Sequence, residues 1–251
     1  MIPTIRFVLV TALRDRLFAS LFGLLAVTIG ISVFLGGGAI MESREMAVVY
    51  AAGGARVFVM LGLIVFTAFH VERLYDTREI EAILARAISR ESFVVSYWTG
   101  LAVIGILLVL PVAVAVFTLG LSVMGAVYWS VSIVLEALML VAFVLFCALT
   151  MERAIPTIFA GVGFYVLARL VSFLLGIVLH GRRSGVNEVI NPIFKFISFI
   201  VPRLDLAGQT RWLVYGVETN TSFLGLIAAQ AAIYVPLLLL ATIFDLRRKN
   251  F

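Results

Sequence analysis

The chain has 251 residues, of which 63% are hydrophobic and 13% are charged, and its mean hydropathy is +1.16. Soluble domains contain roughly 45–50% apolar and about 25% charged residues, so this composition excludes a soluble protein and predicts an integral membrane protein. The net charge of +5 comes from 19 Lys and Arg against 14 Asp and Glu, and in such a protein it signals topology rather than nucleic-acid binding. One cysteine and two histidines are too few for an internal disulfide or a convincing metal centre.

The first residues predict a helix that lies flat on the membrane before the first crossing. Ile2, Ile5, Val8 and Leu9 share one helical face. Arginines interrupt this stretch where a cleavable signal peptide would have its apolar core. We therefore expect an interfacial helix over about residues 2–15.

Six stretches of the chain are long and apolar enough to cross a bilayer, which takes about 20 residues. They lie at about 17–34, 55–71, 94–119, 128–150, 156–180 and 223–244. Gly53 and Gly54 obscure the start of the second span, and Arg56 falls near its outer end, where an arginine can reach water. Pro111 is expected to kink the third span. The sequence therefore predicts an all-α polytopic membrane protein with a single transmembrane domain over 1–251.

The distribution of basic residues predicts which side of the membrane holds the termini. Six spans place both termini on one side, and that side carries eleven Lys and Arg against seven on the other. Because positive residues are retained on the cytoplasmic side, both termini and the loop after the second span are expected in the cytoplasm.

The longest loop, 181–220, contains an apolar stretch at 190–201 that is too short to cross and is followed by Pro202. One interpretation is a short outer-face or re-entrant helix before the sixth span. The other is a loop helix that packs on the bundle.

The longest run dense in charge is 72–100, which has four Arg and five Asp or Glu between two apolar spans. Within it, Ile80, Ile83, Leu84 and Ala87 follow helical spacing, and a helix is predicted over about 77–87. Its apolar face can seat in a groove of a soluble partner. The alternative is a surface helix that packs on its own bundle and binds nothing.

Two ionisable residues fall deep inside predicted spans: Glu136 in the fourth and Arg169 in the fifth. Counted from the outer ends of their spans, their depths differ by roughly 5 Å, so antiparallel neighbours can bring them together. An intramembrane ion pair is one interpretation, and a route for an anionic substrate headgroup is another. A third is that the span boundaries are displaced.

The sequence holds no pattern typical of catalysis. It has no GxxxxGK[ST] phosphate-binding motif, and no Ser, Thr or Cys has a base at a useful spacing. We therefore expect that the chain is not an enzyme and binds no cofactor or metal of its own.

The segment at 80–100 resembles the cytoplasmic signature of ABC-2-type transporter permeases, in the bacterial group with six spans and a separate ATPase. Ile80, Ile83 and Leu84 match the apolar face of that signature, Arg86 its basic position, and 88–90 its Ile-Ser-Arg element. The basic ending IFDLRRKNF and the run FIVPRLDLAG are similar to elements of the same family. The segment departs from the family pattern at Glu79, Ala87, Ser96 and Tyr97, where Thr, Pro and a Gly-Lys pair are common.

This resemblance implies a multi-pass subunit of the bacterial inner membrane that dimerises with a second permease copy or a paralogue. A pair of cytoplasmic ABC ATPase subunits would supply ATP and Mg and would dock on a coupling helix between spans two and three, while lipids surround the spans. The residues implied for ATPase docking are Arg78, Glu79, Ile80, Glu81, Ile83, Leu84, Arg86, Ser89 and Arg90.

The function expected from the sequence is therefore transport, with the chain as an exporter permease. A non-transporting membrane anchor that recruits a cytoplasmic factor through the same helix is the alternative. An ion-coupled secondary transporter fits less well, because such proteins usually carry more intramembrane carboxylates. The sequence leaves the substrate open, and the apolar stretch at 190–201 favours a lipidic cargo.

Overall fold

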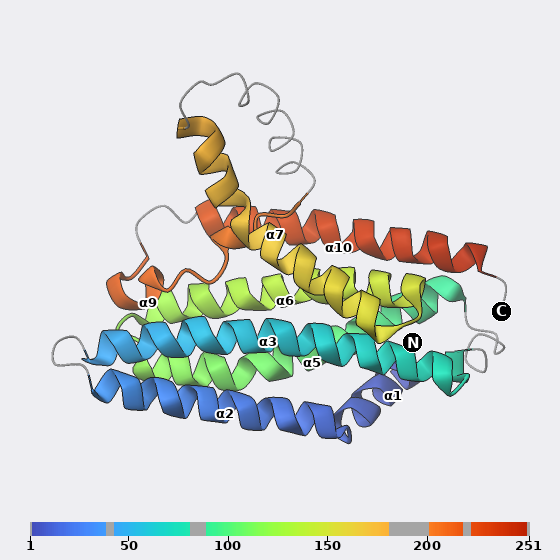
Figure 1. The fold of residues 1–251 in the computed structure, drawn as a ribbon, viewed down its shortest axis with the longest axis horizontal. Helices are drawn as coiled ribbons and strands as arrows, with labels where there is room; N and C mark the ends of the chain where they lie inside the picture. Colours follow the sequence, from blue (N-terminus) through green and yellow to red (C-terminus); the bar gives the residue numbers. More distant parts are fainter. Residues whose placement is uncertain (1, 39–42, 81–88, 181–200, 218–221, 250–251) are drawn as a thin grey trace.

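The computed structural model describes residues 2–38, 43–80, 89–180, 201–217 and 222–249. This part of the chain is helical and contains no strand (Figure 1). Its elements are α1 (Ile2–Leu13), α2 (Arg16–Gly37), α3 (Ser43–Asp76), α5 (Arg90–Leu119), α6 (Val123–Met151), α7 (Ala154–His180), the 3-10 turn η1 (Leu204–Leu206), α9 (Arg211–Tyr215) and α10 (Ser222–Arg248). Six of these helices, namely α2, α3, α5, α6, α7 and α10, are long and apolar enough to cross a membrane. The predicted all-α class and the six apolar spans are confirmed.

Several helices extend well beyond the predicted spans, and α3 differs most. It begins at Ser43 rather than near residue 55 and runs for 34 residues, which is roughly 50 Å. Gly53 and Gly54 therefore lie inside the helix instead of at its start. A side chain at Gly54 would come within 3.3 Å of Thr28 on α2, so glycine allows the two helices to lie close together there.

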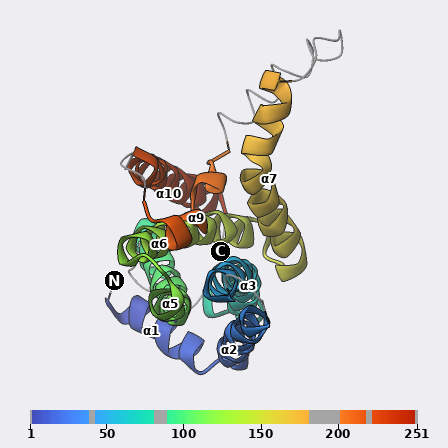
Figure 2. The same cartoon turned by 90° about the vertical axis from the view of Figure 1, so that its left-hand side faces the viewer.

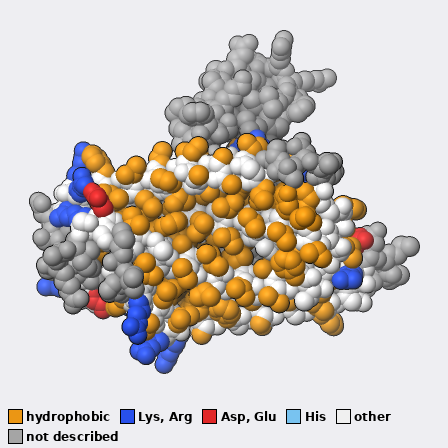
Figure 3. All heavy atoms as spheres, turned by 180° about the vertical axis from the view of Figure 1, so that it is seen from behind, with side chains coloured by type: hydrophobic (Ala, Val, Ile, Leu, Met, Phe, Trp, Pro, Cys, Tyr) orange, Lys and Arg blue, Asp and Glu red, His pale blue; other side chains and the backbone are white. Residues whose placement is uncertain are grey.

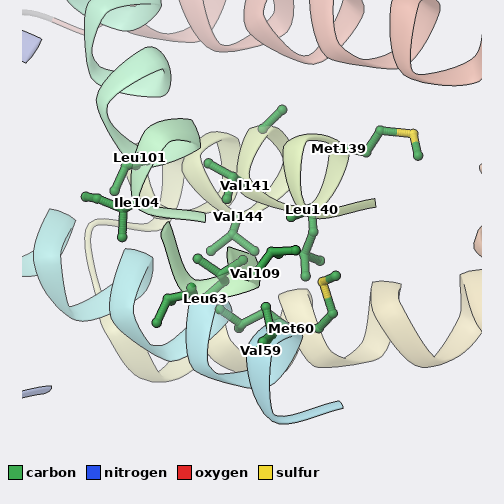
Figure 4. Close-up of a cluster of buried hydrophobic side chains, with 14 of the residues drawn as sticks. Val59, Met60, Leu63, Leu101, Ile104, Val109, Met139, Leu140, Val141 and Val144 are labelled. Atoms are coloured by element: carbon green, nitrogen blue, oxygen red, sulfur yellow. The ribbon is translucent and has the colours of Figure 1, made fainter. Parts of the chain in front are cut away.

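The centre of the bundle is formed by α3, α5 and α6, which carry most of the buried side chains. In Figure 4, Leu63 of α3 lies among Ile104 and Val109 of α5 and Leu140 and Val144 of α6. Such contacts stabilise helix association in lipid through close van der Waals fit rather than through transfer from water. Residues on α2 and α10 are far more exposed, as expected of helices that face lipid.

The outer surface carries the pattern of a membrane protein. Figure 3 shows hydrophobic side chains over the middle of one face, with Lys and Arg mainly toward its ends. Exposed apolar side chains such as Phe34, Phe159 and Leu240 belong to this surface. In water such a surface would aggregate, whereas in a bilayer it contacts acyl chains.

The short helix α1 packs against the bundle through α5. Val8 is fully buried, and a side chain at Gly100 would lie 2.8 Å from its Cβ atom. Asp15 follows α1 and caps α2 by accepting a hydrogen bond from the Leu17 amide at 2.9 Å. It also accepts one from Arg73 Nη1 at 3.0 Å, which ties the junction of α1 and α2 to the end of α3.

Both terminal helices reach the same end of the bundle, here called the terminal end, where 14–16, 72–80, 89–91, 149–154 and 245–249 meet (Figure 1). The opposite end, here called the loop end, holds the connections between α2 and α3 and between α5 and α6. There, Arg44 donates a hydrogen bond to the Leu119 carbonyl at 3.0 Å. In Figures 1 and 2, α7 crosses the other helices obliquely, and its later turns leave the bundle.

Candidate functional site

Glu136 lies at the centre of α6 with none of its surface exposed. Its nearest cation in an ion pair is Arg169 of α7, whose Nη1 atom is 3.7 Å from Glu136 Oε1. This places the two ionisable residues singled out from the sequence side by side. Burying a carboxylate at this position costs free energy of folding unless a cation lies close to it. Arg169 is close enough to reduce that cost.

A third charged residue, Arg56 of α3, also acts electrostatically on Glu136. It lies thirteen residues after the start of α3, as Glu136 does after the start of α6, and this is roughly 20 Å along each helix. The sequence placed Arg56 close to the start of the second span, whereas α3 begins at Ser43, so that Arg56 lies thirteen residues inside the helix.

The two arginines also bind backbone carbonyl groups of the segment around η1. Arg169 Nη1 donates to the Ala207 carbonyl at 3.0 Å and to that of Leu204. Arg56 Nη1 donates to the carbonyl groups of Ala207 at 3.2 Å and Gly208 at 2.7 Å. Arg169 therefore contacts a buried carboxylate and the main chain around η1, and Arg56, which acts electrostatically on the same carboxylate, binds the main chain at 207–208.

This stretch, 204–208, is here called the re-entrant segment, because it enters the helix bundle without crossing it. The Gly208 amide donates to Ser132 Oγ at 2.9 Å, and Ser132 lies nine residues into α6, roughly 14 Å from its start. Leu204 and Ala207 are buried. Non-helical backbone at membrane depth is tolerated only where protein groups satisfy it, and Arg56, Arg169 and Ser132 do so here.

Two glycines allow the segment to approach the helices. Gly208 has a φ of +62°, and a side chain there would lie 2.6 Å from Ile133 Cδ1 and closer still to Arg56. After the segment, α9 packs on the first turn of α6, where a side chain at Gly125 would overlap the Trp212 carbonyl oxygen. Glycine, which has no Cβ atom, is therefore required at both positions.

The charges of this cluster do not balance on their own. Arg56 and Arg169 face the single carboxylate of Glu136, and the Tyr165 side chain of α7 interacts with both Glu136 and Arg56. Nearby, Arg203 pairs with Asp205 at 3.2 Å. The described residues hold no group of three or more His, Cys, Asp or Glu able to bind a metal ion. The observed bonds hold the main chain of 204–208 and a buried charge in place.

Arg56, Ser132 and Gly208 were missed from the sequence as members of this site. An arginine inside an apolar run is a signal in itself, because intramembrane charges are rarely incidental. For Ser132 and Gly208 there is no local signal, since a serine in an apolar helix usually bonds to its own backbone. Ser132 does this as well, donating to the Trp129 carbonyl at 2.8 Å.

The segment predicted to dock an ATPase joins α3 to α5, and the structure describes its two ends. Arg78 follows α3 in a turn with a φ of 56°, and both Arg78 and Glu79 are exposed. Residues 81–88 lie outside the described residues. The predicted docking residues Glu81, Ile83, Leu84 and Arg86 fall within that range.

Ile80 differs from its predicted role as an anchor for a soluble partner. Its side chain is 1% exposed and belongs to the core of this chain. Helical spacing identifies an apolar face, but it does not tell which protein buries that face. Ile80 is therefore removed from the set of residues available to a partner.

Ser89 and Arg90 close the same segment with bonds inside the chain. Ser89 caps α5 by accepting a hydrogen bond from the Ser92 amide at 3.2 Å. Arg90 Nη1 donates to the Lys249 carbonyl at 2.9 Å and to that of Leu246. Arg90 was predicted to face a partner, but its guanidinium instead binds the end of α10, where the last carbonyl groups of the helix need donors.

Further bonds hold the end of α10 at the terminal end. Lys249 Nζ donates to the Leu149 carbonyl at 2.7 Å and pairs with Glu152 at the end of α6. Arg247 pairs with Glu91 in the first turn of α5. The basic ending of the chain is thereby joined to two of the three central helices.

Neither the family models nor the curated proteins include a match to this chain. The resemblance to ABC-2-type permeases therefore rests on the motif residues between spans two and three and on the order of the apolar spans.

Proposed function

We propose that the chain is the membrane-spanning permease subunit of an ABC-2-type transporter, an exporter of the bacterial inner membrane. Both termini and the 77–90 segment face the cytoplasm in this proposal, and α1 is an interfacial helix on that side. The subunit works as a dimer with a second permease. Two ATPase subunits on separate chains hydrolyse ATP with Mg and drive transport.

The position of the 77–90 segment supports this proposal most directly. It connects the end of α3 with the start of α5, two of the three helices that form the centre of the bundle. A partner that moved this segment would act on the core itself rather than on a peripheral helix. An ATP-driven transporter needs such a connection between hydrolysis outside the membrane and helix motion within it.

Fewer residues are available to dock an ATPase subunit than the sequence indicated. Ile83, Leu84 and Arg86 remain as the expected contacts, with Glu81 beside them and with the exposed Arg78 and Glu79 at the start of the segment. Ile80 and Arg90 are occupied within the chain.

The proposal is tested with a tagged chain purified from its native membrane, by measuring the co-purifying ATPase subunit and the ATP hydrolysis of the complex. Ile83→Asp combined with Arg86→Glu should abolish both association and hydrolysis, because it places charge on the apolar face and reverses charge on the rim. Leu121→Asp, on an exposed residue at the loop end, is the control and should retain both.

Unchanged association in the double variant would contradict the docking assignment, provided that its thermal unfolding matches that of the unsubstituted protein. If the variant instead loses a partner that hydrolyses no ATP, the chain is a membrane anchor that recruits this factor. The two outcomes are separated by assaying the captured partner for ATPase activity.

A further inference from the structure

An apolar groove runs between α2 and α3 on the outside of the bundle. Its volume is about 280 Å³, and α2 lines it with Leu17, Ser20, Leu21 and Leu24, which follow one helical face. Phe58 and Val65 line the opposite wall on α3. The groove extends along α2 for roughly 10 Å, the rise between the first and last of these positions.

The two helices close the floor of the groove, and the polar side chain in its lining has a hydrogen-bond partner. A side chain at Gly62 would lie 2.5 Å from Leu21 Cδ2, so α2 and α3 are in contact at this level of the groove. The one polar lining side chain, Ser20, donates its hydroxyl to the Leu17 carbonyl at 2.8 Å. The groove therefore offers hydrocarbon contacts and no free hydrogen-bonding side chain.

The end of the groove at the terminal end carries uncompensated positive charge. Arg14 and Arg16 are exposed and have no acidic partner in the described part of the chain, and Arg16 lies one helical turn before Ser20. The carboxylate between them is already engaged, because Asp15 caps the Leu17 amide and pairs with Arg73. Arg16 thus directly precedes Leu17, the first groove residue of α2, and Arg14 lies two residues earlier at the junction with α1.

We propose that this groove binds an anionic phospholipid of the leaflet at the terminal end. One acyl chain lies in the groove, and the phosphate group lies against Arg14 and Arg16. The site presents apolar walls and, next to them in the chain, two cations, which suit the hydrocarbon chain and the anionic headgroup of such a lipid. The inference does not depend on an ATPase partner.

A second copy of the chain is the competing occupant, and the charges argue against it. In a membrane dimer with a two-fold axis along the bilayer normal, the same residues of both copies lie at the same depth. An interface through this groove would therefore bring the Arg14 and Arg16 side chains of one copy toward those of the other. Repulsion between them disfavours that arrangement, whereas a phosphate group is attracted.

The test measures lipid retained by the purified protein in native mass spectrometry. Palmitoyl-oleoyl phosphatidylglycerol is compared with phosphatidylcholine of the same chains. We expect the unsubstituted protein to retain phosphatidylglycerol preferentially, and Arg16→Gln to reduce this preference about five-fold. Arg6→Gln, which removes the same charge from an exposed position on α1, is the matched control and should change it little.

A second pair of variants tests the acyl site without any change in charge. Ser20→Trp fills the groove and should release the bound lipid. Ala19→Trp adds the same bulk at the same depth on the opposite side of α2, where the surface is exposed, and should not.

Three outcomes would overturn the proposal. If Arg16→Gln and Arg6→Gln reduce the preference for phosphatidylglycerol equally, the lipid is attracted by the positive surface in general and not by this groove. Retention of lipid by Ser20→Trp would place the acyl chain elsewhere. A disulfide between two copies of a Ser20→Cys variant would place a second copy in the groove, and the buried native Cys147 does not interfere with that assay.

Discussion

Glu136, Arg56 and Arg169 show how a charge is kept inside an apolar helix bundle. A buried ion pair loses hydration that its Coulomb attraction only partly replaces, so such a pair is weak evidence for net stability. Here both arginines also donate hydrogen bonds to main-chain carbonyl groups of the re-entrant segment. Removal of the glutamate would leave two cations around one site, and removal of an arginine would leave carbonyl groups unbonded.

We expect Glu136→Gln to lower the free energy of unfolding by about 3–5 kcal/mol, because it leaves buried cations without their anion. The double variant Glu136→Gln with Arg169→Gln should lose less free energy of unfolding than the two single variants lose together. The difference, which is the coupling energy of the pair, should be about 1–3 kcal/mol. The measurement is a double-mutant cycle by denaturant unfolding in mixed micelles.

The matched control for this cycle is the exposed pair Arg153 and Asp76, whose charged atoms are 4.0 Å apart. Its coupling should be at most about 1 kcal/mol, because solvent screens it. If the effects of the Glu136 and Arg169 substitutions simply add, the two residues do not act as a pair.

The re-entrant segment is the element that departs most from a simple bundle of crossing helices. Every main-chain polar group in the apolar part of a membrane requires a partner, and a short stretch supplies only some of its own, such as the bond from the Ala207 amide to the Leu204 carbonyl at 3.1 Å. Side chains from α3, α6 and α7 supply others, so the segment is held by three helices that are distant in sequence. Its fold thus depends on the assembly of the bundle.

Gly208→Ala is expected to destabilise the protein by at least about 1–3 kcal/mol, because a positive φ and the contact with Ile133 both oppose a side chain. Gly163→Ala is the control. Its site on α7 has no atom within 4 Å, and alanine there should stabilise the helix by up to about 1 kcal/mol. Thermal unfolding in detergent compares the two, and equal stability would mean that the segment tolerates a side chain at Gly208.

At the scale of the whole molecule, the arrangement of six antiparallel spans predicts which sites share a membrane face. With both termini in the cytoplasm, as proposed, a cysteine introduced at Thr77 should react with a membrane-impermeant maleimide only from the cytoplasmic side, and one at Gly38 only from the other side. The unsubstituted protein is the control, because Cys147 is buried and should remain unlabelled. Labelling of both positions from one side would contradict the topology.

Hydropathy alone predicts the six spans, because length and apolar composition decide whether a helix crosses a bilayer. It places the start of α3 too late, because the helix begins at Ser43 and includes Gly53, Gly54 and Arg56. Glu136 and Arg169 are recognisable as charges within apolar runs. Their arrangement around residues 204–208 could not be predicted, since contacts between segments so far apart leave no local pattern. Likewise, the apolar spacing that includes Ile80 does not tell whether this chain or a partner covers it.

The bond from Arg90 to the end of α10 gives that helix contacts at two distant places. At the terminal end, α10 is fastened to the first turn of α5, where the 77–90 segment finishes. The same helix also touches η1 in the re-entrant segment. Its 27 residues span roughly 40 Å, with Pro236 near the middle, where a missing backbone hydrogen bond softens the rod. A force applied beside the 77–90 segment can therefore be passed along α10 to residues near η1, and the helix is easiest to bend at Pro236.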